Sequence, residues 1–166
     1  MTSPVITLQF VLGKGVSSGA IAWFSQGHFS HVDAVLPDGS LLGARSDRIL
    51  GIDPGVQIRP ANYEKWLKRT QFTIPCTDDQ YYRWRGFLHR QMHAPYDKMA
   101  ILAFATNRNW REPDSWICSE LQCAALEEAN VTSSLYLAAN KVTPVMCAMV
   151  ASAVQGSSYQ DMPVYG

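Results

Sequence analysis

The chain has 166 residues, of which 47% are hydrophobic and 17% are charged, a composition typical of one globular domain with a sizeable core. Lys and Arg together number 14, as do Asp and Glu, so the formal net charge is zero. This balance gives no electrostatic reason to bind nucleic acid or an anionic membrane. We therefore expect a single domain over residues 1–166 and no nucleic-acid partner.

The N-terminal segment lacks the features of a targeting sequence, because no basic stretch precedes an apolar run and no small-residue cleavage site follows. No apolar run reaches the ~18 residues that cross a bilayer. The sequence predicts a cytoplasmic protein without stable membrane insertion. Such a protein could reach the outside of the cell by release on lysis or as part of a phage assembly. The four cysteines do not form the pattern of a disulfide framework, so we expect free thiols in a reducing compartment.

The first half of the chain has the patterns of β-strands. Apolar and β-branched runs predict strands at 4–12, on either side of 37–40, at 56–59 and at 72–74. The Asp38-Gly39 pair predicts a two-residue hairpin turn between the second and third strands. Residues 17–26 predict a short helix that Gly27 ends.

The second half has the patterns of helices. Thr77–Gln80 has the form of a capping box, and Thr143-Pro144 supplies a cap and a first-turn proline for a helix that ends near Val154. Asp114 or Ser115 is expected to cap a helix that carries Cys118. Three further segments are predicted as a short helix at 97–106, a polar loop at 107–114 and a loosely ordered tail at 155–166. The fold class is therefore α+β, with a small antiparallel sheet packed against helices.

Cys118 lies in the segment SWICSELQCAAL, where that helix begins. If Ser115 is the cap, the sulfur lies in the first turn, where unpaired amides and the helix dipole favour a negative side chain. Such a cysteine has a lowered pKa and can act as a nucleophile, provided that a base manages its proton. The alternative interpretation is a packed core thiol.

His31 is the candidate base. Strand alternation in FSHVDAV puts Val32 and Ala34 on an apolar face, and His31 with Asp33 on the opposite face, where a helix start could dock. The alternative for His31 alone is a strand histidine whose hydrogen bonds are satisfied. His28 is expected in an exposed loop.

His89 and His93 are four residues apart in the helix that the capping box opens, a spacing that can bind a metal. The HRQMH segment lacks the glutamate that follows the first histidine of zinc-protease helices, so we expect neither a metal site nor another cofactor. A metal protein that uses these histidines and one cysteine is the third alternative for function.

Four short motifs follow one another along the chain: SHV at Ser30–Val32, PYD at Pro95–Asp97, CSEL at Cys118–Leu121 and VTP at Val142–Pro144. This ordered set resembles the circularly permuted branch of the NlpC-type papain-like cysteine peptidase superfamily. In that branch the histidine strand precedes the cysteine helix, the reverse of the usual order. The resemblance covers roughly residues 13–149 and implies a papain-like fold.

The resemblance implies Cys118 as the nucleophile and His31 as the general base. It also suggests Tyr96 as a hydroxyl-bearing residue that binds substrate close to the site. The alternative for Tyr96 is a core aromatic residue with its hydroxyl at the surface.

The third catalytic residue is where the sequence departs from these relatives. They usually carry a polar residue, often glutamate, on the strand after the histidine strand, and here that position is Gly43. A two-residue turn at Asp38-Gly39 places Ser46 opposite His31, so Ser46 is the first candidate to accept the ring N–H. Asp33 is the second candidate, and a backbone carbonyl or a water is the third.

Together these observations predict a cysteine hydrolase, a peptidase or amidase, that cleaves an amide bond in a peptide or an acylated amine. The resemblance makes bacterial peptidoglycan peptides a natural substrate class, in a phage or prophage context, and lipid-linked amides or esters stay open. The missing carboxylate at Gly43 favours the alternative, a weak or inactive papain-like domain that binds a ligand or forms part of an assembly. No oligomeric state is predicted.

Overall fold

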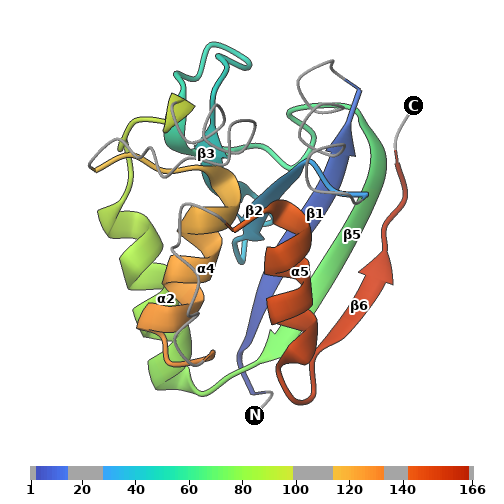
Figure 1. Cartoon of the computed structure of the whole chain (residues 1–166), viewed down its shortest axis with the longest axis vertical. Helices are drawn as coiled ribbons and strands as arrows, with labels where there is room; N and C mark the ends of the chain where they lie inside the picture. Colours follow the sequence, from blue (N-terminus) through green and yellow to red (C-terminus); the bar gives the residue numbers. More distant parts are fainter. Residues whose placement is uncertain (1–2, 15–27, 99–113, 133–141, 165–166) are drawn as a thin grey trace.

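The computed structural model describes residues 3–14, 28–98, 114–132 and 142–164. Within these ranges the chain forms one six-stranded sheet and three helices (Figure 1). The strands are β1 (Val5–Gly13), β2 (His31–Val35), β3 (Leu41–Arg45), β4 (Gly55–Arg59), β5 (Trp66–Pro75) and β6 (Ser158–Asp161). The helices are α2 (Asp78–Arg90), α4 (Cys118–Glu128) and α5 (Pro144–Ala153).

The strand order is β4-β3-β2-β1-β5-β6, and every neighbouring pair is antiparallel. Helix α4 packs on β2 and β3, α5 packs on β5, and α2 lies beside α4. Figure 1 shows the helices in front of one face of the sheet. The predicted α+β class is confirmed.

Each face of β2 lies against its own cluster of buried apolar residues. Val32 and Ala34 belong to the main core, which also contains the buried side of α4. The smaller cluster includes Tyr63, which hydrogen-bonds Asp33 from the opposite face. The predicted alternation of β2 is therefore confirmed, and the polar face is buried as well as the apolar one.

Two of the three predicted helix starts are correct. The Thr77 side chain accepts from the backbone N–H of Gln80, and the Gln80 side chain accepts from that of Thr77, which completes the capping box of α2. Thr143 caps α5 with a single hydrogen bond, which its side chain accepts from Met146 N, and Pro144 lies in the first turn. At α4 the prediction is wrong: the N-cap is Ile117, without a side-chain cap, rather than Asp114 or Ser115.

The hairpin between β2 and β3 has a longer loop than predicted. Leu36 N donates to Ser40 O at 2.8 Å, so three residues span the turn, and Gly39 supplies the left-handed position (φ 82°). The strands pair Ala34 with Leu42, a register that puts Arg45 rather than Ser46 opposite His31. The predicted pairing of His31 with Ser46 is therefore wrong by one residue.

The C-terminal tail is more ordered than predicted. Residues 158–161 form β6, which pairs with β5, and β5 itself extends well beyond the predicted 72–74. The helix expected at 17–26, and most of the helix expected at 97–106 and of the loop at 107–114, lie outside the described residues. Of the helices within the described ranges, none is long and apolar enough to cross a bilayer.

Candidate active site

Local hydrogen bonds fix the two elements that carry the predicted catalytic pair. His31 is the first residue of β2. Ser30, the residue before it, ties this end of the strand to β1, because its Oγ accepts from Gly13 N at 3.1 Å and donates to Val11 O. Cys118 is the first residue of α4. One turn later, Gln122 Nε2 donates to the carbonyl of Leu42 at 3.0 Å, which holds α4 on β3.

The structure brings Cys118 and His31 together. The two side chains lie close enough for the charge of His31 to act on the thiol, and both residues are buried, with 5% and 7% of their surfaces exposed. Burial by itself raises the pKa of the Cys118 thiol, but the charge of His31 and the hydrogen bond to it outweigh burial and lower that pKa. The first turn of α4 adds the positive end of its dipole.

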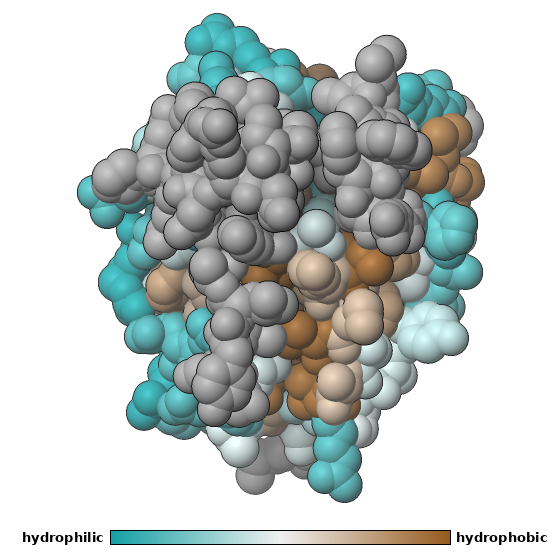
Figure 2. Space-filling view, in the orientation of Figure 1, coloured by the Kyte–Doolittle hydropathy of each residue, from teal (hydrophilic) through white to brown (hydrophobic). Residues whose placement is uncertain are grey.

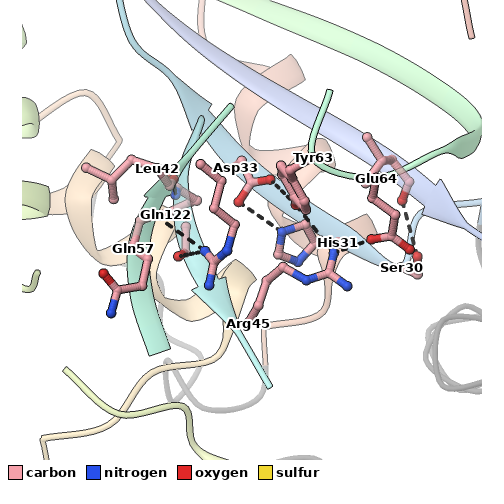
Figure 3. A network of polar contacts seen from close by, with 12 residues as sticks. Ser30, His31, Asp33, Leu42, Arg45, Gln57, Tyr63, Glu64 and Gln122 are labelled. Carbon is pink, nitrogen blue, oxygen red and sulfur yellow. Dashed lines mark hydrogen bonds and ion pairs between the residues drawn. The ribbon is translucent and has the colours of Figure 1, made fainter. Parts of the chain in front are cut away.

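Asp33 holds the other side of the imidazole (Figure 3). Its Oδ1 lies 2.9 Å from His31 Nε2, and the Tyr63 hydroxyl donates to its Oδ2 at 2.8 Å. Each imidazole nitrogen can serve one partner, so Nδ1 is left for the sulfur of Cys118. Asp33, the second candidate for the third residue, therefore contacts His31. Ser46, the first candidate, follows the end of β3 and is exposed.

The charges of Cys118, His31 and Asp33 favour the ionised form of one another despite burial. Burial lowers the pKa of His31, but the Asp33 carboxylate and the Cys118 thiolate raise it to about 9. Burial likewise raises the pKa of Asp33, whereas His31 and the Tyr63 hydroxyl lower it. All three shifts favour the charged forms, an imidazolium between a thiolate and a carboxylate.

A second layer of polar side chains surrounds Asp33. Arg45 Nη1 donates to the Tyr63 hydroxyl at 3.3 Å and pairs with Glu64 at 2.7 Å, while Arg45 Nε pairs with Asp47 at 2.9 Å. Arg59 is buried close to the same carboxylate, and its Nη1 donates to Gly43 O at 3.1 Å. Sequence reasoning missed this layer, because no spacing rule relates Tyr63 to a partner 30 residues away.

Tyr96 lies beside the thiol. Trp116 N donates to Pro95 O, and Asp97 N donates to Trp116 O, both at 3.0 Å, so the PYD motif pairs with the segment just before α4. Tyr96 is 8% exposed. Burial, followed by the charge of Cys118, raises the pKa of its hydroxyl. The bridge between Tyr96 and Trp116 places this tyrosine next to the segment that leads into Cys118.

The remaining histidines do not join this site. His28, His89 and His93 are exposed, and α2 ends at Arg90, so His93 is outside the helix that His89 occupies. In the part of the chain that the structure describes, no three His, Cys, Asp or Glu side chains are grouped so as to hold a metal ion.

The other cysteines differ from Cys118. All four are free thiols. Cys123 in α4 and Cys147 in α5 are buried and share a hydrogen bond, and Cys76 is partly exposed next to α2. Burial raises the pKa of Cys76.

Comparison with known proteins gives a fold but no family. No protein-family model matches the chain, and no curated protein matches it. Among solved structures, the metalloprotein yiiX from Escherichia coli O157:H7, assigned to DUF1105, is similar with a TM-score of 0.60 over 99% of both chains. The two sequences are 13% identical, so the likeness concerns the fold alone.

Proposed function

We propose that the protein is a papain-like cysteine hydrolase that cleaves an amide bond, with Cys118 as nucleophile, His31 as general base and acid, and Asp33 as the residue that orients the imidazole. The observation that carries this proposal is the placement of the buried Cys118 beside His31, whose ring in turn lies 2.9 Å from the Asp33 carboxylate. A nucleophile, a base and an orienting group within hydrogen-bonding reach are the minimum that acyl transfer requires.

The chemistry begins from the ion pair. The Cys118 thiolate attacks the amide carbonyl carbon, and the carbonyl oxygen becomes an oxyanion. His31 gives its proton to the leaving nitrogen as the C–N bond breaks, which releases the amine and leaves a thioester on the sulfur. His31, now neutral, takes a proton from water as that water attacks the thioester, and the acid product departs from the regenerated thiolate.

The start of α4 can stabilise the oxyanion. The first intrahelical bond at this end runs from Leu121 N to Ile117 O, so the amides of the preceding turn have no acceptor within the helix. Such amides and the helix dipole favour a developing negative charge beside the sulfur. Tyr96 is the hydroxyl that we assign to contact with substrate, because its backbone pairs with Trp116, two residues before Cys118.

The substrate class follows from the motif resemblance. We assign an amide in a peptide or in an acylated amine, with cell-wall peptides as the first class to test. The fold neighbour is described as a metalloprotein. We do not extend a metal to this chain, because the described residues offer no matching set of ligands.

One observation favours the alternative of an inactive papain-like domain that binds a ligand or serves as a structural component. Only 5% of the Cys118 surface is exposed, so access to the sulfur is narrow. Incubation with peptidoglycan fragments and acyl-amide panels separates the two functions. Release of an amine that Cys118→Ala abolishes supports the hydrolase, and saturable binding without release supports the alternative.

The direct test measures alkylation of the folded protein by iodoacetamide between pH 5 and 9, with the modified cysteine located by mass spectrometry. We expect Cys118 to react at pH 6, because its thiolate persists below the usual range. Cys76 is the internal control, since its raised pKa confines its reaction to alkaline pH. A Cys118 that reacts only near pH ~8.5, like a free cysteine, would overturn the proposal.

A further inference from the structure

Gly43 lies beside Asp33 in the sheet. The pairing of Ala34 with Leu42, continued by one residue, sets Asp33 opposite Gly43. A Cβ atom on Gly43 would fall 1.9 Å from Asp33 Oδ1 and 3.0 Å from Asp33 Cγ. Both distances are shorter than van der Waals contact, so the Asp33 carboxylate occupies the space that a side chain at position 43 would fill.

Neither partner of this contact is free to move away. Both carboxylate oxygens of Asp33 are engaged, one with His31 at 2.9 Å and one with Tyr63 at 2.8 Å. The backbone of Gly43 pairs with Gln57 in β4, and its carbonyl accepts from Arg59. A side chain added at position 43 would therefore displace the carboxylate from the imidazole or open the sheet.

The backbone of Gly43 does not itself require glycine. The glycines with positive φ are Gly39, Gly51, Gly55 and Gly156 among the described residues, and Gly43 is not one of them. A glycine inside a strand weakens the strand and commonly marks the close approach of another group. Here that group is the carboxylate of Asp33.

We propose that Gly43 is a positioning residue of the candidate active site, because the side chain that it lacks leaves the space in which the Asp33 carboxylate lies against His31. This inference rests on the proposed function. The carboxylate that orients the base thus comes from the base's own strand, two residues on, and position 43 on the next strand must be empty to admit it.

The test follows the titration of the His31 ring by NMR, which needs no substrate. In the wild-type protein the midpoint is expected near pH 9. Gly43→Ala should lower it by at least about one pH unit, a tenfold loss of proton affinity, because the ring loses an adjacent opposite charge. The other charged groups around the ring, Cys118, Arg45, Asp47, Glu64 and Arg59, are unchanged in this variant.

Exchanging the residues at positions 33 and 43 tests whether the ring needs a carboxylate in this space, whichever strand supplies it. Asp33→Gly should lower the midpoint as Gly43→Ala does, and the double variant Asp33→Gly/Gly43→Asp should recover at least part of the loss. The recovery is expected because a Cβ at position 43 lies 1.9 Å from the present Oδ1, so a carboxylate built there reaches the same ring. The exchange also decides the question if Gly43→Ala fails to fold.

Gly86→Ala is the matched control, since a Cβ there meets only Arg90 Nη1 at 3.5 Å, an ordinary contact, on α2. It should leave His31 unchanged. A raised wild-type midpoint that Gly43→Ala does not lower would overturn this inference and leave the proposed function intact. A wild-type midpoint near the ordinary value of ~6.5 would instead overturn the proposed function.

Discussion

The pKa values of two buried thiols of the same core, Cys118 and Cys147, shift in opposite directions. A hydrogen bond with Cys123, together with burial, raises the pKa of Cys147 well above its usual range. Burial acts on Cys118 in the same direction, but the His31 imidazole reverses the effect. The difference teaches that burial alone raises the pKa of a thiol and that a neighbouring imidazole can reverse this shift, as nucleophilic cysteines require.

The elements that carry the two thiols explain why only one has a base. Cys118 is the first residue of α4, and His31 is the first residue of β2, so the start of the helix meets the start of the strand. Cys147 is on α5, whose inner face meets α4 and whose outer face is apolar, with Met146 and Met149 exposed (Figure 2). The groups that shift the pKa of Cys147 are two other thiols, Cys123 and Cys118, together with burial, and none of them is a base.

His31→Ala should abolish the difference between the two thiols. Without the imidazolium, burial and the Asp33 carboxylate both raise the pKa of Cys118, and the thiolate fraction at pH 6 falls although the first turn of α4 still favours the thiolate. We expect the rate of alkylation of Cys118 at pH 6 to fall by about three orders of magnitude. Quantitative mass spectrometry of the labelled peptide measures this rate.

The Cys76 peptide of the same sample serves as the control, because Cys76 is remote from His31 in the sequence and its pKa shift has other causes. An alkylation profile of Cys118 that His31→Ala leaves in place would mean that the helix dipole alone activates the thiol, and the imidazole would lose its assigned role.

Asp33→Asn should weaken the fold as well as the site. Removing the charge leaves a buried imidazolium without its carboxylate, a change that costs about 3 kcal/mol in comparable buried pairs. The folded pKa of Asp33 is lowered, so its contribution is present above the unfolded value of ~3.9 and is lost as pH falls through the folded pKa. Urea unfolding at pH 7 and at pH 3 should therefore show a large difference from wild type that shrinks in acid. Equal differences at both pH values would contradict an ionised Asp33.

Ser119→Ala tests whether the second residue of the CSEL motif has a structural role beside the proposed catalytic role of Cys118. Ser119 is buried, and its Oγ donates to Val142 O, so it joins α4 to the VTP segment. Loss of this hydrogen bond should lower the free energy of unfolding by about 1 kcal/mol. The alkylation profile of Cys118 should change by less than about twofold, since the Ser119 hydroxyl is directed to Val142 O and His31 is the group that lowers the pKa of Cys118. A large change in that profile would move Ser119 into the active site.

Local patterns explain what could be predicted from the sequence. The capping box of α2 is contained within Thr77–Gln80, and Thr143-Pro144 opens α5 with adjacent residues, so neighbouring side chains determine both helix starts. The pairing of Cys118 with His31 was available only through the ordered set of motifs, since 87 positions separate the two residues.

The third residue could not be chosen from local patterns. Whether Ser46 or Arg45 lies opposite His31 depends on whether the hairpin loop has two or three residues, and Asp38-Gly39 is compatible with both lengths. A shift of one residue changes the face of every side chain. The role of Tyr63 depends on the path of the chain between β4 and β5. No pattern in the sequence indicates that this path brings the Tyr63 hydroxyl to Asp33.

Cys147→Ala is the smallest change and the sharpest test of the comparison between the thiols. Truncating a buried cysteine to alanine should cost about 1 kcal/mol of stability, because the cavity that remains is small. Cys118 should keep its reactivity at pH 6 within about twofold, since its lowered pKa is attributed to His31 and not to the neighbouring thiols. Alkylation kinetics across pH 5 to 9 measure this, with wild type as reference. A rise in Cys118 reactivity of tenfold or more would show that Cys147 restrains the thiolate, and the two regions would then have to be treated as one coupled group of thiols.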